Sequence, residues 1–252
     1  MRRIHRTGLP KRALAYLKRR QTKVDQGQDA GTAWESARRT KTMRTVEHTL
    51  RAMSRGRQRC MFCEDSRGTD IDHFWPKSRY SNRTFVWENL LLACAGCNGK
   101  KGKRFDLGAD GRPLLIDPTA EDPWDFLFFD PDTGIIVARF NLATGATDPK
   151  GEHTTDPQVL PLNIDPVTDG RQRIARSLRR AVGRFLGCAE GDPAEALDDL
   201  LAELRDHDDY GLLEWYFLRD GQDDSPFSDL RARHPTAWGK IAKTVGSGFR
   251  VP

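Results

Sequence analysis

The sequence predicts an α+β fold that is mostly helical and divided into four successive regions. Apolar residues recur at helical spacing near both ends of the 252-residue chain, whereas short apolar runs and turn dipeptides alternate in its middle. Four of the five cysteines form two Cys-x-x-Cys pairs around a short mixed segment. We therefore expect a basic helical N-terminal region, a compact core around the cysteines, a turn-rich segment with a β-hairpin and a helical C-terminal region, at residues 1–55, 56–105, 106–159 and 160–252.

The N-terminal region is expected to form helices with few apolar anchors. A Gly/Gln/Asp-rich stretch at residues 25–31 should interrupt them, because glycine and the short polar residues favour turns over helix interiors. The anchors that we expect to be buried are Leu14, Leu17, Trp34, Thr45, Leu50 and Met53.

Turn dipeptides dominate the segment at residues 106–159, which contains repeated Asp-Pro, Asp-Gly and Thr-Gly pairs. They flank two extended apolar runs at residues 126–129 and 134–140. The residues between these runs, Asp130 to Gly134, have turn composition, which predicts a β-hairpin.

The C-terminal region should be helical. Ile174, Leu178, Val182 and Phe185 lie at helical spacing opposite arginines, a pattern typical of a packed helix face. A second helix should start near Asp192-Pro193. The dense apolar cluster at residues 212–218 is either part of the core or a docking face for a partner protein.

The two cysteine pairs, Cys60/Cys63 and Cys94/Cys97, are separated by 30 residues and predict a structural zinc site. Two Cys-x-x-Cys knuckles supply four thiolates, the tetrahedral shell that zinc prefers. A redox motif should sit beside a βαβ pattern, which is not visible, and disulfides are not expected because the chain starts without a signal-peptide pattern. Cys188 is expected to be a small buried residue.

The segment between the cysteine pairs contains residues of a different chemical kind. Asp72 and His73 lie near the end of an alternating run at residues 69–76, which predicts a short strand stopped by Pro76. Asn89 belongs to an apolar run that is either a second strand or a helical turn, and Asn98 should start a short basic helix. Thiolates suit a soft metal, whereas carboxylate, imidazole and amide groups suit a hard metal that does chemistry. The combination indicates a metal-dependent nuclease.

These residues, in the pattern C-x-x-C, D-H-F-x-P-K, W-E-N-L-L and C-x-x-C-N-x-x-K, resemble HNH endonucleases, especially those found beside retron and Septu-type antiphage systems. The resemblance implies a zinc-stapled ββα-metal core in which Asp72 and Asn98 hold catalytic Mg²⁺ or Mn²⁺. It also implies that His73 is the general base and that Asn89 fixes the loop and the imidazole, through the His73 backbone. Asp70 lies on the same strand face as Asp72 and could assist the metal, although a solvent-exposed carboxylate is the expectation.

Charge is distributed unevenly along the chain. Residues 1–60 contain 17 Lys/Arg and 4 Asp/Glu, a net +13, whereas the remainder contains 24 and 32, a net −8. This asymmetry favours contact between the N-terminal region and nucleic-acid phosphates. The first cationic cluster runs from Arg2 and Arg6 to Lys23. Closer to the expected site, the predicted nucleic-acid contacts are Arg55, Arg57, Arg59, Lys77, Lys100 and Lys101.

The leading hypothesis is an HNH endonuclease that cleaves DNA and acts in antiphage defence with an ABC-type ATPase partner. The defence role and the partner are what the resemblance to the Septu-type group implies. The chain has no phosphate-binding loop, so if cleavage is linked to ATP, another polypeptide must supply the ATPase. One alternative is a non-catalytic, zinc-stabilised nucleic-acid-binding module, and another is an RNA nuclease with a target such as tRNA. No apolar run approaches the length of a membrane span, so a cytoplasmic protein without membrane contact is expected.

Overall fold

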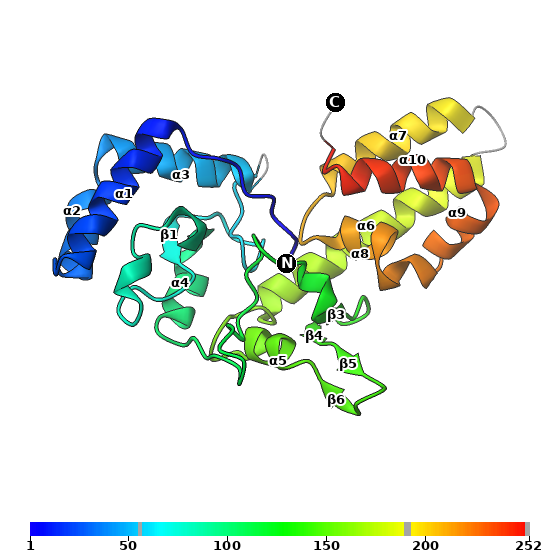
Figure 1. Cartoon of the computed structure of the whole chain (residues 1–252). Helices are drawn as coiled ribbons and strands as arrows, with labels where there is room; N and C mark the ends of the chain where they lie inside the picture. Colours follow the sequence, from blue (N-terminus) through cyan, green and yellow to red (C-terminus); the bar gives the residue numbers. More distant parts are fainter. Residues whose placement is uncertain (55–56, 189–192, 250–252) are drawn as a thin grey trace. The chain divides into compact units, whose positions relative to one another are not determined.

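The computed structural model describes residues 1–54, 57–188 and 193–249, which divide into two compact units. Unit 1 contains Met1, residues 3–127 and residues 137–162, and unit 2 contains Arg2, residues 128–136 and the chain from residue 163 onward. Figure 1 labels their helices and strands. About half of the chain is helical and its strands are few and short, which confirms the predicted α+β, mostly helical class.

Unit 1 begins with three helices, α1 (Lys11–Asp25), α2 (Ala30–Ala37) and α3 (Lys41–Met53), drawn in blue in Figure 1. The expected interruption is present between α1 and α2, where Gly27 has a φ of +104° and Asp29 caps α2 by accepting a hydrogen bond from Thr32 N–H. Leu17 and Leu50 are buried, as expected. Leu14 was expected to be buried as well but is 48% exposed, so the buried face of α1 is narrower than predicted.

The segment between the cysteine pairs folds into two strands and a helix. Strand β1 (Asp70–His73) pairs antiparallel with β2 (Leu90–Ala93), so that Asp70 lies opposite Ala93 and His73 opposite Leu90. The turns η1 (Ser81–Arg83) and η2 (Trp87–Asn89) lie between the strands, so the run before the second cysteine pair contains both the helical turn and the strand.

Helix α4 (Ala95–Lys101) follows β2 directly. The sequence predicted that this helix begins at Asn98, but it begins three residues earlier, at Ala95. The reason is that Cys94 is the N-cap, since its Sγ accepts a hydrogen bond from Cys97 N–H at 3.4 Å. The cysteine knuckle therefore serves as the helix start.

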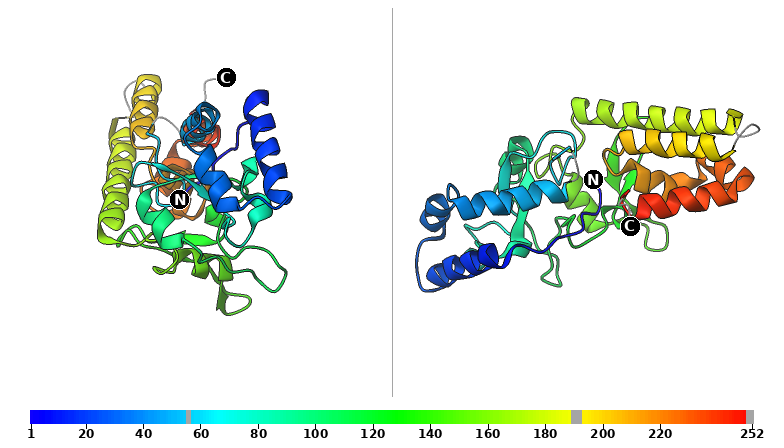
Figure 2. Two further views of the ribbon diagram at one scale, coloured as in Figure 1. Left: turned by 90° about the vertical axis from the view of Figure 1, so that its left-hand side faces the viewer. Right: turned by 90° about the horizontal axis from the view of Figure 1, so that it is seen from above.

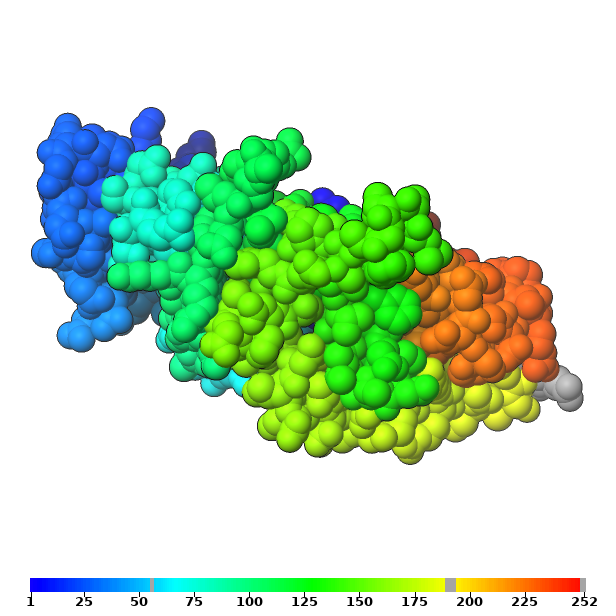
Figure 3. All heavy atoms as spheres, turned by 90° about the horizontal axis from the view of Figure 1, so that it is seen from below, coloured from blue at the N-terminus to red at the C-terminus, as the bar shows by residue number. Residues whose placement is uncertain are grey.

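The turn-rich segment contains two short hairpins where one was expected. Strands β3 (Leu127–Phe129) and β4 (Ile136–Ala138) pair around a turn closed by the Gly134 N–H to Asp130 C=O hydrogen bond. Strands β5 (Phe140–Asn141) and β6 (Ala146–Thr147) form the second, and η3 (Pro123–Asp125) and α5 (Pro149–Thr155) complete the segment. Residues of this segment, in green, contribute much of the surface in Figure 3.

Unit 2 is built from α6 (Asp165–Cys188), α7 (Pro193–Asp206), α8 (Leu212–Leu218), η4 (Asp220–Asp223), α9 (Phe227–Arg233) and α10 (Pro235–Gly246), with α6 and α7 side by side in Figure 2. The apolar cluster of α8 is core, because Trp215, Tyr216 and Phe217 are buried and the Tyr216 ring stacks on Phe227 at 4.1 Å. None of the helices in the described ranges is long and apolar enough to cross a bilayer.

Candidate functional site

The four paired cysteines converge on one buried point. Their sulfur atoms lie within 4.8 Å of one another, and Cys63 Sγ is 3.9 Å from Cys94 Sγ. Zinc held tetrahedrally by bonds of about 2.3 Å would separate its sulfur ligands by about 3.8 Å, so the spacing fits that ion. All four are free thiols, and hydrogen bonds from Cys60 and the other thiols lower the pKa of Cys94 well below its usual range.

The first knuckle is attached to the sheet, which brings the two pairs together. Met61 N–H donates to the Leu92 carbonyl at 2.8 Å, and Cys60 N–H donates to the Ser66 carbonyl at 2.9 Å. The fifth cysteine, Cys188, stands apart from this cluster at the end of α6 and is exposed. Its predicted burial is therefore wrong, because it lies outside the apolar face that α6 buries.

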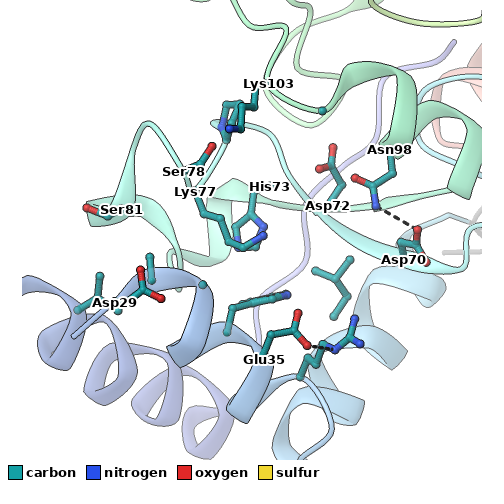
Figure 4. Close-up of a pocket in the computed structure, with 18 of the residues that line it drawn as sticks. Asp29, Glu35, Asp70, Asp72, His73, Lys77, Ser78, Ser81, Asn98 and Lys103 are labelled. Atoms are coloured by element: carbon teal, nitrogen blue, oxygen red, sulfur yellow. Dashed lines mark hydrogen bonds and ion pairs between the residues drawn. The ribbon is translucent and has the colours of Figure 1, made fainter.

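A second group of residues lines a pocket of about 1090 Å³ in unit 1. Asp72 and His73 come from β1, Asn98 and Lys101 from α4, and Trp34 from α2. Figure 4 shows the side chains of Asp72 and Asn98 pointing toward one another. The predicted catalytic residues Asp72, His73 and Asn98 are thus brought to one place.

Asp70 orients the amide of Asn98. Asn98 Nδ2 donates a hydrogen bond to Asp70 Oδ2 at 3.0 Å, which leaves the Asn98 oxygen as an acceptor on the side of Asp72 (Figure 4). Asp70 is half-buried, so the expectation of a solvent-exposed carboxylate is wrong. The alternation of β1 explains the contact, since Asp70 and Asp72 lie on the same face of the strand, toward α4.

Asp72 is a buried carboxylate with unused hydrogen-bonding capacity. Asp72 is 6% exposed. Its Oδ2 forms an ion pair with Lys101 Nζ at 3.1 Å but accepts no hydrogen bond from the described residues. Burial raises the pKa of Asp72, and the Lys101 ammonium opposes that rise. A buried oxygen without a donor is costly. A divalent cation bound between this oxygen and the Asn98 amide would satisfy it, so the donor set fits a hard metal.

Lys101 is placed differently from the sequence prediction. Its side chain is 1% exposed, and its ammonium donates to Asp72 Oδ1 at 3.3 Å and to the His73 carbonyl at 2.7 Å. The predicted nucleic-acid contact is wrong for this residue, because its charge is held inside the protein. The signal that could have found this role is helical spacing, since Lys101 lies three residues after Asn98 and so on the same face of α4.

The imidazole of His73 is oriented by a backbone carbonyl and an aromatic ring. His73 Nε2 lies 2.9 Å from the Thr84 oxygen, and the Trp34 ring packs against it edge-on with centroids 4.3 Å apart. A carbonyl only accepts hydrogen bonds, so Nε2 carries the proton and Nδ1 is the basic nitrogen. Burial and then the positive charge of Lys77 lower the pKa of His73 to about 3, so its ring is neutral.

Asn89 holds both ends of the loop at residues 75–83. Its Oδ1 accepts from Trp75 N–H at 2.7 Å, and its Nδ2 donates to the carbonyls of Trp75 at 3.1 Å and Arg83 at 2.8 Å. Asn89 was expected to act through the His73 backbone, but the His73 carbonyl is bound by Lys101. Asn89 instead fixes the residue before Thr84, whose carbonyl orients the imidazole.

The N-terminal helices contribute to the site, a role that the sequence did not reveal. Gln21 of α1 accepts from Phe85 N–H at 2.8 Å and donates to the Ser81 carbonyl at 3.1 Å, so it braces the segment that contains Thr84. Trp34 of α2 contacts His73 itself. No local motif marks either residue, because both reach the site through tertiary packing.

The predicted nucleic-acid contacts have mixed environments. Arg55 lies outside the described residues, Arg57 is exposed, and Arg59 donates to the Asp65 carbonyl. Lys77 lines the pocket, and Lys100 is exposed on α4.

Two arginines of the first cationic cluster have structural roles. Arg6 donates to the carbonyls of Trp87, Glu88 and Leu90, while Arg2, in unit 2, is 5% exposed and pairs with Asp208 at 2.7 Å. They are therefore not the phosphate contacts that their sequence position suggested.

Comparisons with known proteins agree with this geometry. The family model for HNH endonucleases matches residues 58–104. The Septu protein PtuB of Bacillus thuringiensis is 30% identical over 147 residues, which cover 56% of this chain and 51% of that protein. The chain thus spans about half the length of the curated relative that it matches. The predicted resemblance to HNH proteins of Septu type is confirmed.

Proposed function

We propose that this chain, which carries an HNH endonuclease domain, is a metal-dependent endonuclease that hydrolyses phosphodiester bonds in DNA. The observation that supports it best is the buried Asp72 carboxylate, whose Oδ2 is ion-paired with Lys101 but accepts no hydrogen bond from a described residue, and which faces the Asn98 amide in the pocket that contains His73. These donors fit Mg²⁺ or Mn²⁺. When bound, such a cation stabilises negative charge on the phosphate and on the leaving oxygen.

His73 is proposed to be the general base. Nε2 makes the hydrogen bond to the Thr84 carbonyl, so Nδ1 is the nitrogen that can accept a proton from the attacking water. The ring is neutral, so the lone pair of Nδ1 is unprotonated at physiological pH.

Lys101 and Asn89 are proposed to be positioning residues. Lys101 joins α4 to both the Asp72 carboxylate and the His73 carbonyl, and thereby fixes the Asp-His pair relative to Asn98. Asn89 fixes the loop that supplies the Thr84 carbonyl. Preorganisation of this kind keeps reactive groups within the narrow geometry that catalysis requires.

Cys60, Cys63, Cys94 and Cys97 are proposed to hold a structural Zn²⁺. A closed shell of four thiolates leaves no coordination position for a substrate, so this ion would stabilise the fold. Its position at the start of α4 and at the end of β2 would secure the helix that carries Asn98 and the strand that pairs with β1, which carries Asp72.

The relative named a Septu protein supports a proposed role in antiphage defence, in which the chain acts with an ABC-type ATPase. Arg57, Arg59, Lys77 and Lys100 remain proposed contacts to the DNA backbone. The proposed association with an ATPase is consistent with the lack of a phosphate-binding loop in this sequence.

A plasmid-nicking assay tests the proposal. Wild type and His73→Ala are compared with and without Mg²⁺ or Mn²⁺, and zinc content is measured on the same samples. We expect metal-dependent nicking by wild type, loss of nicking in the variant and unchanged zinc. Cleavage of RNA but not DNA would favour the RNA nuclease. Binding without cleavage, even with the ATPase added, would favour the non-catalytic module.

A further inference from the structure

The loop between the strands of the HNH domain has a charge pattern that the catalytic chemistry does not use. Residues 73–87 contain three cationic side chains and no Asp or Glu. Residues 98–105 are also free of acidic side chains and contain four Lys/Arg. The two segments meet at Phe105, whose ring lies 4.8 Å from Trp75 and whose carbonyl accepts from Arg79 at 2.7 Å.

Two arginines of this loop lie over aromatic rings. The guanidinium carbon of Arg83 lies 4.4 Å from the Trp75 ring centroid, and that of Arg79 lies 5.6 Å from the Tyr80 ring. Trp75 and Tyr80 pack edge to face at 4.8 Å, so the four side chains form one continuous cluster. We call these residues, Trp75, Arg79, Tyr80 and Arg83, the arginine–aromatic cluster.

The backbone beneath the cluster is fixed. Asn89 binds the loop at Trp75 and at Arg83, and Gln21 binds it at Ser81. A guanidinium that is already stacked on a ring above a fixed backbone loses little conformational entropy when it binds a ligand. The cluster is therefore preorganised, although both arginines are exposed.

No carboxylate neutralises these arginines. Within the described residues, Arg79 and Arg83 take part in no ion pair, and the same holds for the exposed Lys100, Lys103 and Arg104. The positive charge of the loop is thus available to an anionic ligand.

The cluster adjoins the catalytic pocket along the chain. Lys77 and Ser78 of the same loop line that pocket together with Lys103 (Figure 4). Arg83 immediately precedes Thr84, whose carbonyl holds the His73 imidazole.

We propose that Arg79 and Arg83, preorganised on Tyr80 and Trp75, bind backbone phosphates of the DNA strand next to the scissile phosphate. This inference rests on the proposed nuclease function. A planar guanidinium matches a phosphate with paired hydrogen bonds, and contacts to the backbone need no particular base sequence. The arginines therefore position the strand, while sequence preference, if any, comes from elsewhere on the chain.

The test measures DNA binding by fluorescence anisotropy with the full chain carrying His73→Ala, so that cleavage does not interfere. The variants are R79A, R83A and both together, and the matched control is R112A. Arg112 is 84% exposed at the side chain on a turn of the same unit and lies 3.7 Å from Asp110. A duplex and a single-stranded oligonucleotide are titrated at several salt concentrations, and zinc content and thermal melting verify that each variant is folded.

We expect the double variant to bind the duplex more weakly. We also expect the negative slope of log K against log salt to decrease in magnitude by about 1.8, since each lost phosphate contact contributes about 0.9. The corresponding decrease for the single strand is about 1.4, at about 0.7 for each contact. R112A should match its parent. In a Trp75→Leu background, R83A should have a smaller effect than on its own, because the ring that orients the guanidinium is gone.

Unchanged affinity and salt slope in the double variant, with DNA still bound by the parent, would overturn the inference and leave the nuclease proposal standing. Cleavage by wild type and by its R79A/R83A variant can also be compared at low DNA concentration. Equal cleavage by the two proteins would overturn the inference too. If the parent binds neither oligonucleotide and wild type cleaves neither, the proposed function fails along with the inference.

Discussion

Replacing Lys101 by methionine tests whether the active site depends on a buried ion pair. The change keeps most of the side-chain length but removes the charge that lies 3.1 Å from Asp72 Oδ2. The side chains of Lys101 and Asp72 are 1% and 8% exposed, so water cannot replace the lost partner. Removing one partner of a buried pair typically costs about 3–5 kcal/mol, and the hydrogen bond to the His73 carbonyl is lost as well.

We therefore expect K101M to lower the free energy of unfolding by about 3–5 kcal/mol, measured by urea denaturation of zinc-loaded protein without Mg²⁺ or Mn²⁺. K100M is the matched control, since Lys100 is exposed on the same helix, and its effect should stay within about 0.5 kcal/mol. The double variant K101M/D72N should cost clearly less than the sum of the two single changes, because neither buried charge remains.

Mn²⁺ provides a second readout of the same pair. The cation restores positive charge beside Asp72, so it should raise the melting temperature of K101M by more than that of wild type. A K101M protein as stable as K100M would refute the reasoning, because it would mean that Asp72 is neutral or solvated without its partner. An equal effect of Mn²⁺ on K101M and wild type would show that the cation does not bind next to this carboxylate.

Three further predictions concern the site. His73→Ala should lower kcat for nicking by about 10²–10⁴-fold, the usual contribution of a general base, with zinc content unchanged. The pKa of His73 is about 3 in the folded protein, whereas in the unfolded chain it is near the ordinary 6.5. As the pH falls, the unfolded state therefore takes up the proton first. The contribution of this residue to stability is present above about pH 6.5 and is lost between there and pH 3. Urea denaturation at pH 7.5 and 5.5 should accordingly show a smaller pH effect in His73→Ala than in wild type. Removing zinc with a chelator should abolish nicking and lower the far-UV circular dichroism signal, and added zinc should restore both. A chelated protein that keeps its full signal would contradict the structural role of the cysteines.

The proposed catalytic residues could be brought together from the sequence because their signals are local. The spacing of the two Cys-x-x-Cys pairs is enough to predict a four-thiolate cluster, and the structure places all four sulfurs within 4.8 Å. Asp72, His73 and Asn98 lie between or next to these pairs, so a compact fold of that segment must bring them close together. The pattern of apolar spacing likewise predicted the helical ends of the chain, although it missed the exposed side chain of Leu14.

The supporting residues could not be found in this way because their roles depend on contacts far apart in sequence. Gln21 lies about 60 residues before the loop that it braces, and Trp34 lies 39 residues before His73. Lys100 and Lys101 look equivalent in a basic stretch, yet one is exposed and the other is buried. Only the orientation of α4 against β1 distinguishes them.

Strand geometry explains why the N-terminal helices belong to the active site. Adjacent residues of a strand point to opposite faces, so Asp72 and His73 cannot both be supported by one neighbouring element. Asp72 is held from α4 by Lys101, whereas the His73 ring packs against Trp34 of α2. Helix α1 adds Gln21, which fixes the segment that supplies the Thr84 carbonyl. The ββα unit alone supplies the face of β1 that carries the proposed metal ligands, and the helices before it supply the face on which the proposed base is oriented. The positive charge of the N-terminal region is therefore only part of its contribution, since the same helices also form one wall of the pocket.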